Sequence, residues 1–313
     1  MFQYILRRLI MLIPVIIGVS ILTFLMIHIA PGDPVSVMLP DHATARDAEL
    51  IRARLGLDQP LHIQYFSFVR NVVQLDFGQS VQTGRRVGTE LFARWPTTVQ
   101  LTAISLTIAI LMGIPLGIIA AIKRASFTDH FSMVFALLGF CLPSFFLALL
   151  LQLLFGMRLQ WLPVYGLGGS LWTWEGFKSL ILPGLSLGLS SAGVLARMTR
   201  SNMLEVLQVD YIRTARAKGL WERRIIFKHA LKNALIPVTT IIGVQFGSLL
   251  GGAFITETVF ALPGVGRYAV NAIFARDFPI IQAVTLMMAM VFVLCNLGVD
   301  LIYAYLDPRI RYD

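Results

Sequence analysis

The chain has 313 residues, of which 57% are hydrophobic and only 14% are charged, so the composition excludes an ordinary soluble domain and indicates a membrane protein. The formal net charge of +9 arises from basic residues that lie mostly beside long apolar runs. This pattern favours membrane orientation and lipid contact over nucleic-acid binding. Cys141 and Cys295 lie separately in apolar runs, so their spacing predicts neither a disulfide nor a metal cluster.

The first apolar run, residues 9–29, follows Arg7 and Arg8. It is longer than the apolar part of a secretory signal peptide, and no small-residue cleavage site follows it. The motif Pro-Gly-Asp-Pro at 31–34 ends the predicted helix. Residues 1–30 are therefore predicted to form a cytoplasmic N-terminus and a first transmembrane helix.

The stretch 31–96 is polar, and its acidic and basic residues nearly cancel. A long loop without a basic excess is compatible with the external side of the membrane. Apolar spacing predicts helices at 47–55 and 63–73, separated by a turn at 56–60. We expect this stretch to form an external, mostly helical segment.

Five further apolar runs follow and predict a permease core over residues 97–306. Pro143 should kink the third transmembrane helix, and the tryptophan-rich loop at 157–179 suits the external interface. Basic residues cluster on the opposite side, which predicts six transmembrane helices with both termini inside and a cytoplasmic tail at 307–313. The five predicted runs are 99–122, 131–156, 180–195, 238–256 and 280–306.

The segment 210–237 is the most basic connection between two apolar runs. Asp210 is a predicted N-cap and Gly219 a predicted helix stop, after which a second helix should run from 221 to 234 and end before Pro237. Two interpretations are open at this point. The segment is either a solvated loop that only fixes topology or a docking element for a soluble partner, within a larger cytoplasmic loop at about 198–236.

Glycines recur at four-residue intervals in the fifth transmembrane helix, at Gly243, Gly247 and Gly251. They predict close approach of another helix, either in ordinary packing or at the transport pathway. Gln245 and Ser248 lie at or beside this row and could offer hydrogen bonds to a cargo.

Beyond the outer end of that helix, Glu257 and Arg267 are candidates for an ion pair or for an external gate, with neither interpretation preferred.

No sequence matching GxxxxGK[ST], GxSxG, HExxH or CxxC occurs, and the five histidines show no metal-ligand spacing. The sequence therefore predicts no catalytic residue, no metal site and no P-loop for ATP. Three classes of membrane protein are then open: a transporter subunit powered by a partner, a self-contained secondary transporter and a membrane enzyme. The lack of a catalytic constellation disfavours the enzyme, and the lack of clear repeats and buried ionisable residues disfavours the secondary transporter.

The run Tyr211-Ile-Arg-Thr-Ala-Arg-Ala-Lys-Gly219-Leu, followed by Asn-Ala-Leu-Ile-Pro at 233–237, resembles the cytoplasmic EAA loop of ABC-importer permeases. The runs ILRR, PGDP, LGLDQP, DFGQS and DPRIR resemble the dipeptide/oligopeptide/nickel branch in particular. Arg213 stands where the general motif has a glutamate, and the interval between Gly219 and Pro237 is longer than usual, as in that branch.

The resemblance implies an all-α membrane protein with the type I ABC-importer permease fold, six transmembrane helices and a large external helical insertion between the first two. It implies alternating access, driven by ATPases that dock on the 210–237 loop. The residues implied in ATPase coupling are Tyr211, Arg213, Thr214, Ala215, Arg216, Ala217, Lys218, Gly219 and Leu220.

The same resemblance implies a bacterial inner-membrane protein that forms half of a pathway for di- or oligopeptides, with nickel or glutathione as alternative cargoes. Its implied partners are a second homologous permease, two cytoplasmic ATPase subunits, a periplasmic or lipid-anchored solute-binding protein and membrane lipid, but no nucleic acid. ATP and Mg would be bound by the ATPase subunits, and this chain would carry no cofactor.

Overall fold

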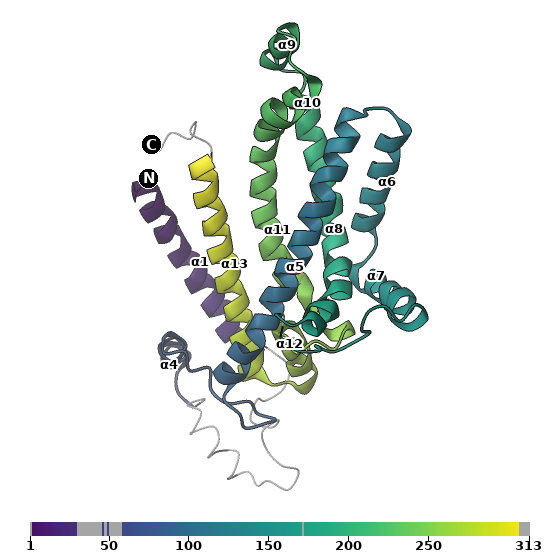
Figure 1. Cartoon of the computed structure of the whole chain (residues 1–313). Coiled ribbons are helices and arrows are strands. Elements are labelled where there is room, and N and C mark those ends of the chain that lie inside the picture. Colours follow the sequence, from purple (N-terminus) through teal and green to yellow (C-terminus); the bar gives the residue numbers. More distant parts are fainter. Residues whose placement is uncertain (1, 30–45, 47–48, 50–57, 171, 307–313) are drawn as a thin grey trace. The chain divides into compact units, whose positions relative to one another are not determined.

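The structure, a computed structural model, describes residues 2–29, 46, 49, 58–170 and 172–306. Most of the described chain is helical (Figure 1). Its elements are α1 (Phe2–Ile29), α4 (Leu61–Val73), α5 (Val87–Ile122), α6 (Phe127–Cys141), α7 (Ser144–Leu151), η1 (Gln152–Arg158), α8 (Trp174–Val206), α9 (Asp210–Ala217), α10 (Glu222–Arg224), η2 (Ile225–Ala230), α11 (Leu231–Val259), α12 (Val265–Ala275) and α13 (Phe278–Leu306).

Within the described ranges, five helices are long and apolar enough to cross a membrane. A sixth crossing results if α6 and the α7–η1 pair count as one broken helix. These two parts meet at a bend of 104°, at the Leu142–Pro143 step. Proline lacks an amide hydrogen and disfavours helical backbone in the residue before it, which explains why the helix breaks there. The predicted kink at Pro143 is thus present, but it is a sharp break.

The chain divides into two compact units, and α5 and α13 each run from one unit into the other. The first unit comprises 1–97 and 263–293, and the second comprises 98–262 and 294–313.

In the first unit, α4 packs on α1 through Tyr65, which shares a 2.8 Å hydrogen bond with the hydroxyl of Ser20 and packs edge-on against Phe24. Gln282 of α13 donates to the backbone oxygen of Thr23 at 3.0 Å and so joins α13 to α1. The helix predicted at 63–73 is confirmed as α4, whereas the one predicted at 47–55 lies almost entirely outside the described residues.

Asp277 organises the loops of the first unit. Its carboxylate is buried and accepts hydrogen bonds from the hydroxyl of Ser80 at 2.5 Å and from the backbone amide of Gln82 at 3.3 Å. Nearby, the guanidinium of Arg94 lies over the ring of Tyr268, 4.5 Å from its centroid. Burial raises the pKa of Tyr268 to about 12, so this phenol stays protonated under ordinary conditions.

The second unit is organised around α8, which packs against both α5 and α6 through small residues. A Cβ atom on Gly117 of α5 would lie only 2.5 Å from the backbone oxygen of Ala196, and one on Gly188 would lie 2.7 Å from that of Ser105. The absence of side chains at these positions therefore permits backbone contact between neighbouring helices, as is common in membranes.

Two sequence predictions about helix limits are wrong. The fourth transmembrane helix is not the short stretch 180–195 but the 33-residue α8, whose glycines and serines are largely buried. The helix after Gly219 does not end before Pro237, because α10, η2 and α11 run on continuously and Pro237 lies inside α11. Membrane helices tolerate proline, since other groups can satisfy the backbone oxygen that it leaves without a donor.

Candidate functional site

The candidate coupling surface comprises α9 and the segment from Gly219 to Ala230, where α8 ends and α11 begins (Figure 1). α9 has only eight residues, which is too short for a stable isolated helix. Ile212 and Ala215 are buried on one face, and Ile212 has no exposed surface. They pack in an apolar cluster with Ile225, Met203 and their neighbours, so tertiary packing holds α9 in place.

The end of α9 confirms the predicted helix stop at Gly219. Gly219 has a φ of +74°, and its amide donates to the backbone oxygen of Arg216 at 2.9 Å. The amide of Leu220 donates to the oxygen of Ala215 at 3.3 Å, which completes a Schellman motif. The predicted N-cap is wrong by one residue, because Val209 is the N-cap and Asp210 is the first helical residue. There the Asp210 carboxylate still suits the positive end of the helix dipole.

The other face of α9 is exposed and basic. Arg213, Arg216 and Lys218 are exposed, as are Tyr211, Thr214 and Ala217. Arg216 forms a fork with the carboxylate of Glu222, with nitrogen–oxygen distances of 2.6 and 3.2 Å. This hydrogen bond raises the pKa of Arg216, and the fork orders the turn around Gly219.

Tyr211 connects α9 to the following helices. Asn233 of α11 donates to its hydroxyl at 2.8 Å, and that hydroxyl lies 3.4 Å from the backbone oxygen of His229, to which it donates. α9 is therefore fastened to the start of α11 by both apolar packing and hydrogen bonds, so the two elements can move together.

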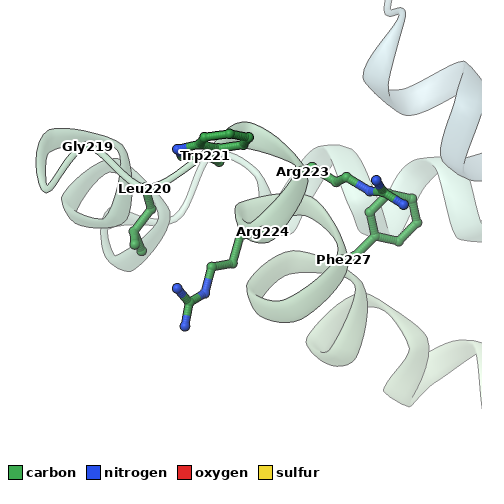
Figure 2. Close-up of a pocket in the computed structure, with 6 residues that line it drawn as sticks. All are labelled: Gly219, Leu220, Trp221, Arg223, Arg224 and Phe227. Carbon is green, nitrogen blue, oxygen red and sulfur yellow. The ribbon is translucent and has the colours of Figure 1, made fainter.

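A hollow of about 590 Å³ lies beside the Gly219 turn. Its lining combines apolar and basic side chains, as Figure 2 shows for Gly219, Leu220, Trp221, Arg223, Arg224 and Phe227. Trp221 is 84% exposed and Phe227 is also exposed. Exposed aromatic side chains beside arginines are typical of protein-binding hot spots. The predicted coupling residues thus form one continuous feature, except that Ala215 points into the core and Leu220 is half-buried.

The predicted pathway residues all lie on α11 but in different environments. A Cβ on Gly243 would collide with Val299 of α13, whereas Gly251 has no neighbouring atoms within 4 Å of such a position. Gly247 is buried, Gln245 is half-buried and Ser248 is exposed. Close packing is therefore seen at Gly243, while the role of the row in transport stays a prediction.

Glu257 is fully buried near the C-terminal end of α11 and accepts a 2.6 Å hydrogen bond from the hydroxyl of Thr98 on α5. Arg267 is half-buried on α12. These two residues belong to different units, so their predicted pairing or gating stays a prediction.

Two polar contacts in the second unit were not found from the sequence. Arg200 of α8 donates from Nε and Nη2 to both oxygens of Asp129, at 2.7 and 2.8 Å, and so fixes the start of α6. Gln152 donates to the backbone oxygens of Val164 at 2.8 Å and Val259 at 3.3 Å. Arg200 lies in the basic segment that the sequence predicts to be cytoplasmic, and nothing in the sequence points to its partner.

Comparison with known proteins gives matches over almost the whole chain. Residues 113–312 match the family described as binding-protein-dependent transport system inner membrane component, and residues 1–102 match its N-terminal model. The chain is 44% identical over 333 residues to a dipeptide transport system permease protein DppB from Alkalihalophilus pseudofirmus, with full coverage of both chains. It is also 44% identical over 312 residues to glutathione transport system permease proteins GsiC from Salmonella typhimurium and Escherichia coli, again with full coverage.

Two solved structures share the fold. A chain of the inward-facing MetNI methionine ABC transporter gives a TM-score of 0.59 at 16% identity, covering 69% of this chain and 96% of that chain. A chain of an amino acid ABC transporter with histidines gives a TM-score of 0.52 at 16% identity, covering 71% and 94%. The chain therefore belongs to the binding-protein-dependent transport family: it is a non-catalytic, multi-pass inner-membrane permease of an ABC transporter, without a cofactor of its own, that works with ATPase subunits.

Proposed function

We propose that this chain forms half of the translocation pathway of an ATP-driven importer for short peptides. In this proposal it has the type I fold with six transmembrane helices, counting the broken α6–α7–η1 pair as the third, and both termini face the cytoplasm. Residues 31–96 form the external insertion. The turn between α5 and α6, which carries Lys123 and Arg124, lies at the same end of the second unit as α9 (Figure 1). Basic residues at one end of a helical bundle favour its cytoplasmic placement.

The observation that carries the proposal is the construction of α9. Ile212 and Ala215 are buried on one face of this helix. Its opposite face presents exposed basic residues beside the hollow lined by Trp221 and Phe227. When a docked soluble protein displaces such a helix, the hydrogen bond between Tyr211 and Asn233 transmits the displacement to α11. We assign ATPase coupling to Tyr211, Arg213–Lys218, Gly219 and Leu220, with Ala215 as an anchor.

The partner set follows from the same proposal. Two cytoplasmic ATPase subunits dock at α9 of this chain and at the equivalent helix of a second, homologous permease, and a periplasmic or lipid-anchored solute-binding protein delivers the cargo outside. We propose that Gln245 and Ser248, beside Gly243, Gly247 and Gly251, line the pathway, and that Glu257 and Arg267 belong to an external gate.

The relatives named for dipeptide and for glutathione transport, each 44% identical, support a small peptide as cargo. Both compounds combine amide groups with free carboxylates, so a pathway with uncharged hydrogen-bonding groups such as Gln245 suits either of them. Nickel remains the alternative cargo, as the resemblance to the dipeptide/oligopeptide/nickel branch implies.

The proposal is tested by purifying the tagged chain from gently solubilised membranes and reconstituting the recovered complex into vesicles. We expect two ATPase subunits and a second permease to copurify, and ATP-dependent uptake of labelled dipeptide or glutathione once the binding protein is added. Transport by the chain alone without ATP would instead establish a secondary transporter. Uptake of nickel but of neither peptide would refute the proposed cargo while leaving the ATP-driven import intact.

A further inference from the structure

A groove of about 210 Å³ lies between α6 and α8, away from the coupling surface. Apart from one cation its lining is apolar: Met133, Leu137, Phe140 and Val194 form the walls, Gly193 lies on the floor, and Arg197 is the cation. The groove exists because the two helices touch through their backbones. A Cβ on Gly193 would collide with the backbone oxygen of Ala136, and one on Gly139 would lie 2.8 Å from that of Leu189.

Arg197 is exposed to this groove, and its guanidinium carbon lies 5.7 Å from the centroid of the Phe140 ring. It takes part in none of the ion pairs formed among the described residues. Arg200, one turn further along α8, is by contrast held by both oxygens of Asp129. The same helix therefore carries one arginine with an internal counter-ion and one whose charge points sideways into an apolar groove.

The surroundings of the groove indicate which kind of group pairs with the guanidinium of Arg197. On α6, Phe131, Val134 and Leu138 are each more than half exposed, as expected for a helix that faces lipid chains. A cation within such a surface is costly unless an anion reaches it. Arg200 contacts the third residue of α6, and Arg197 is only about 4.5 Å deeper along the helix axis. An arginine at this depth is within reach of the headgroup layer by snorkelling.

We propose that this groove binds an anionic phospholipid, with the guanidinium of Arg197 on the phosphate and an acyl segment against Phe140, Leu137 and Val194. A planar guanidinium matches phosphate oxygens in a bidentate manner, and the apolar walls match the chain. Lys123 and Arg124, on the turn that precedes α6, add attraction for anionic headgroups at the same end of the unit. In the proposed topology this end faces the inner leaflet.

The test uses the purified transporter complex in phosphatidylcholine nanodiscs that contain spin-labelled phosphatidylglycerol, with spin-labelled phosphatidylcholine as the uncharged comparison. The measured quantity is the immobilised fraction of each lipid. We expect Arg197→Gln to weaken the preference for phosphatidylglycerol about tenfold, as for the loss of one charge-assisted contact. Val194→Phe, which fills the groove and keeps the arginine, should also release the lipid.

Lys178→Gln is the matched control, because Lys178 is a cation on the same helix that lies over Trp174, near its opposite end. This variant should retain the preference of the wild type. Equal preference in wild type and Arg197→Gln would overturn the proposal, as would full retention in Val194→Phe. The measurement requires no transport, so a negative result here would leave the proposed import function untouched.

Discussion

Replacing Ile212 by alanine is the most direct test of how α9 is held. The side chain of Ile212 is fully buried between α9 and the segment around Ile225, while the helix itself contributes only eight residues. Its removal leaves Ala215, the hydrogen bonds of Tyr211 with Asn233 and His229, and the fork between Arg216 and Glu222 as the attachments described above. We therefore expect α9 to open locally while the long helices stay folded.

The size of the effect follows from the volume removed. Truncating a buried isoleucine to alanine costs about 2–5 kcal/mol, and we expect the lower end because α9 lies at the periphery and its surroundings can relax. A loss of about 2 kcal/mol raises the equilibrium constant for opening roughly thirtyfold, at about 1.4 kcal/mol for each factor of ten, and exchange that follows this equilibrium becomes faster by the same factor.

Hydrogen–deuterium exchange of the purified complex, followed by mass spectrometry of peptides covering 208–220, measures this opening. Val209→Ala is the control, since Val209 is an exposed residue at the N-cap of the same helix. Transport per ATP hydrolysed should fall in Ile212→Ala and not in the control. Unchanged exchange at 208–220 in Ile212→Ala would refute the view that buried apolar contacts hold the coupling helix.

Three further predictions concern other contacts. Gly219→Val should lower transport per ATP hydrolysed without preventing insertion, because a φ of +74° costs a residue with a Cβ about 1–2 kcal/mol while no neighbour obstructs the side chain; normal coupling would contradict this. Asp129→Asn should lower the free energy of unfolding by about 2 kcal/mol, and with it the melting temperature of the complex, since Arg200 loses its charged acceptor. A melting curve identical to that of the wild type would show that the ion pair between Arg200 and Asp129 is dispensable. Gly117→Leu should prevent accumulation of folded protein, because the new side chain meets the backbone of Ala196, whereas Gly251→Leu, placed in open space, should accumulate normally in a fluorescence-detected chromatography assay.

Local backbone chemistry made some features predictable. Gly219 ends α9 as expected, because only a residue that adopts positive φ easily completes a Schellman motif at that position. Pro143 breaks the third apolar run for an equally local reason, although the angle of 104° depends on packing that a sequence does not display. The apolar periodicity of 63–73 likewise gave α4 correctly.

The failures have a common physical cause. Pro237 lies inside α11 and does not end it, and membrane helices tolerate such a proline because neighbouring groups can satisfy the backbone oxygen that it leaves without a donor. Hydropathy predicts a fourth transmembrane helix that is too short, because the glycines and serines of α8 lower its apolar content, whereas in the structure these residues are largely buried against neighbouring helices. Hydropathy identifies helices whose side chains contact lipid, whereas most side chains of α8 contact other helices of the protein and so need not be apolar.

Of the candidate site, the sequence predicts that residues 211–220 lie together at the surface, but not which of them anchor α9, and their role in ATPase coupling stays a prediction. Ala215 belongs to the apolar cluster and not to the exposed face. Pairs such as Thr98 with Glu257, or Asp129 with Arg200, join residues 159 and 71 positions apart. No local pattern encodes such contacts, since they exist only once α5, α8 and α11 have packed.

The continuity of α10, η2 and α11 gives the second unit a long lever. The helix from Glu222 to Val259 has 38 residues and is therefore about 57 Å long at 1.5 Å per residue. If it pivots as one body about the end beside Trp221, a tilt of about 5° displaces its far end, where Glu257 lies, by about 5 Å. The π-helical turns of η2 and the missing amide of Pro237 are the places where such a lever can flex. In the proposed mechanism, bending at these two points reduces the movement that a docked ATPase transmits from Trp221 to the end of α11 at Glu257.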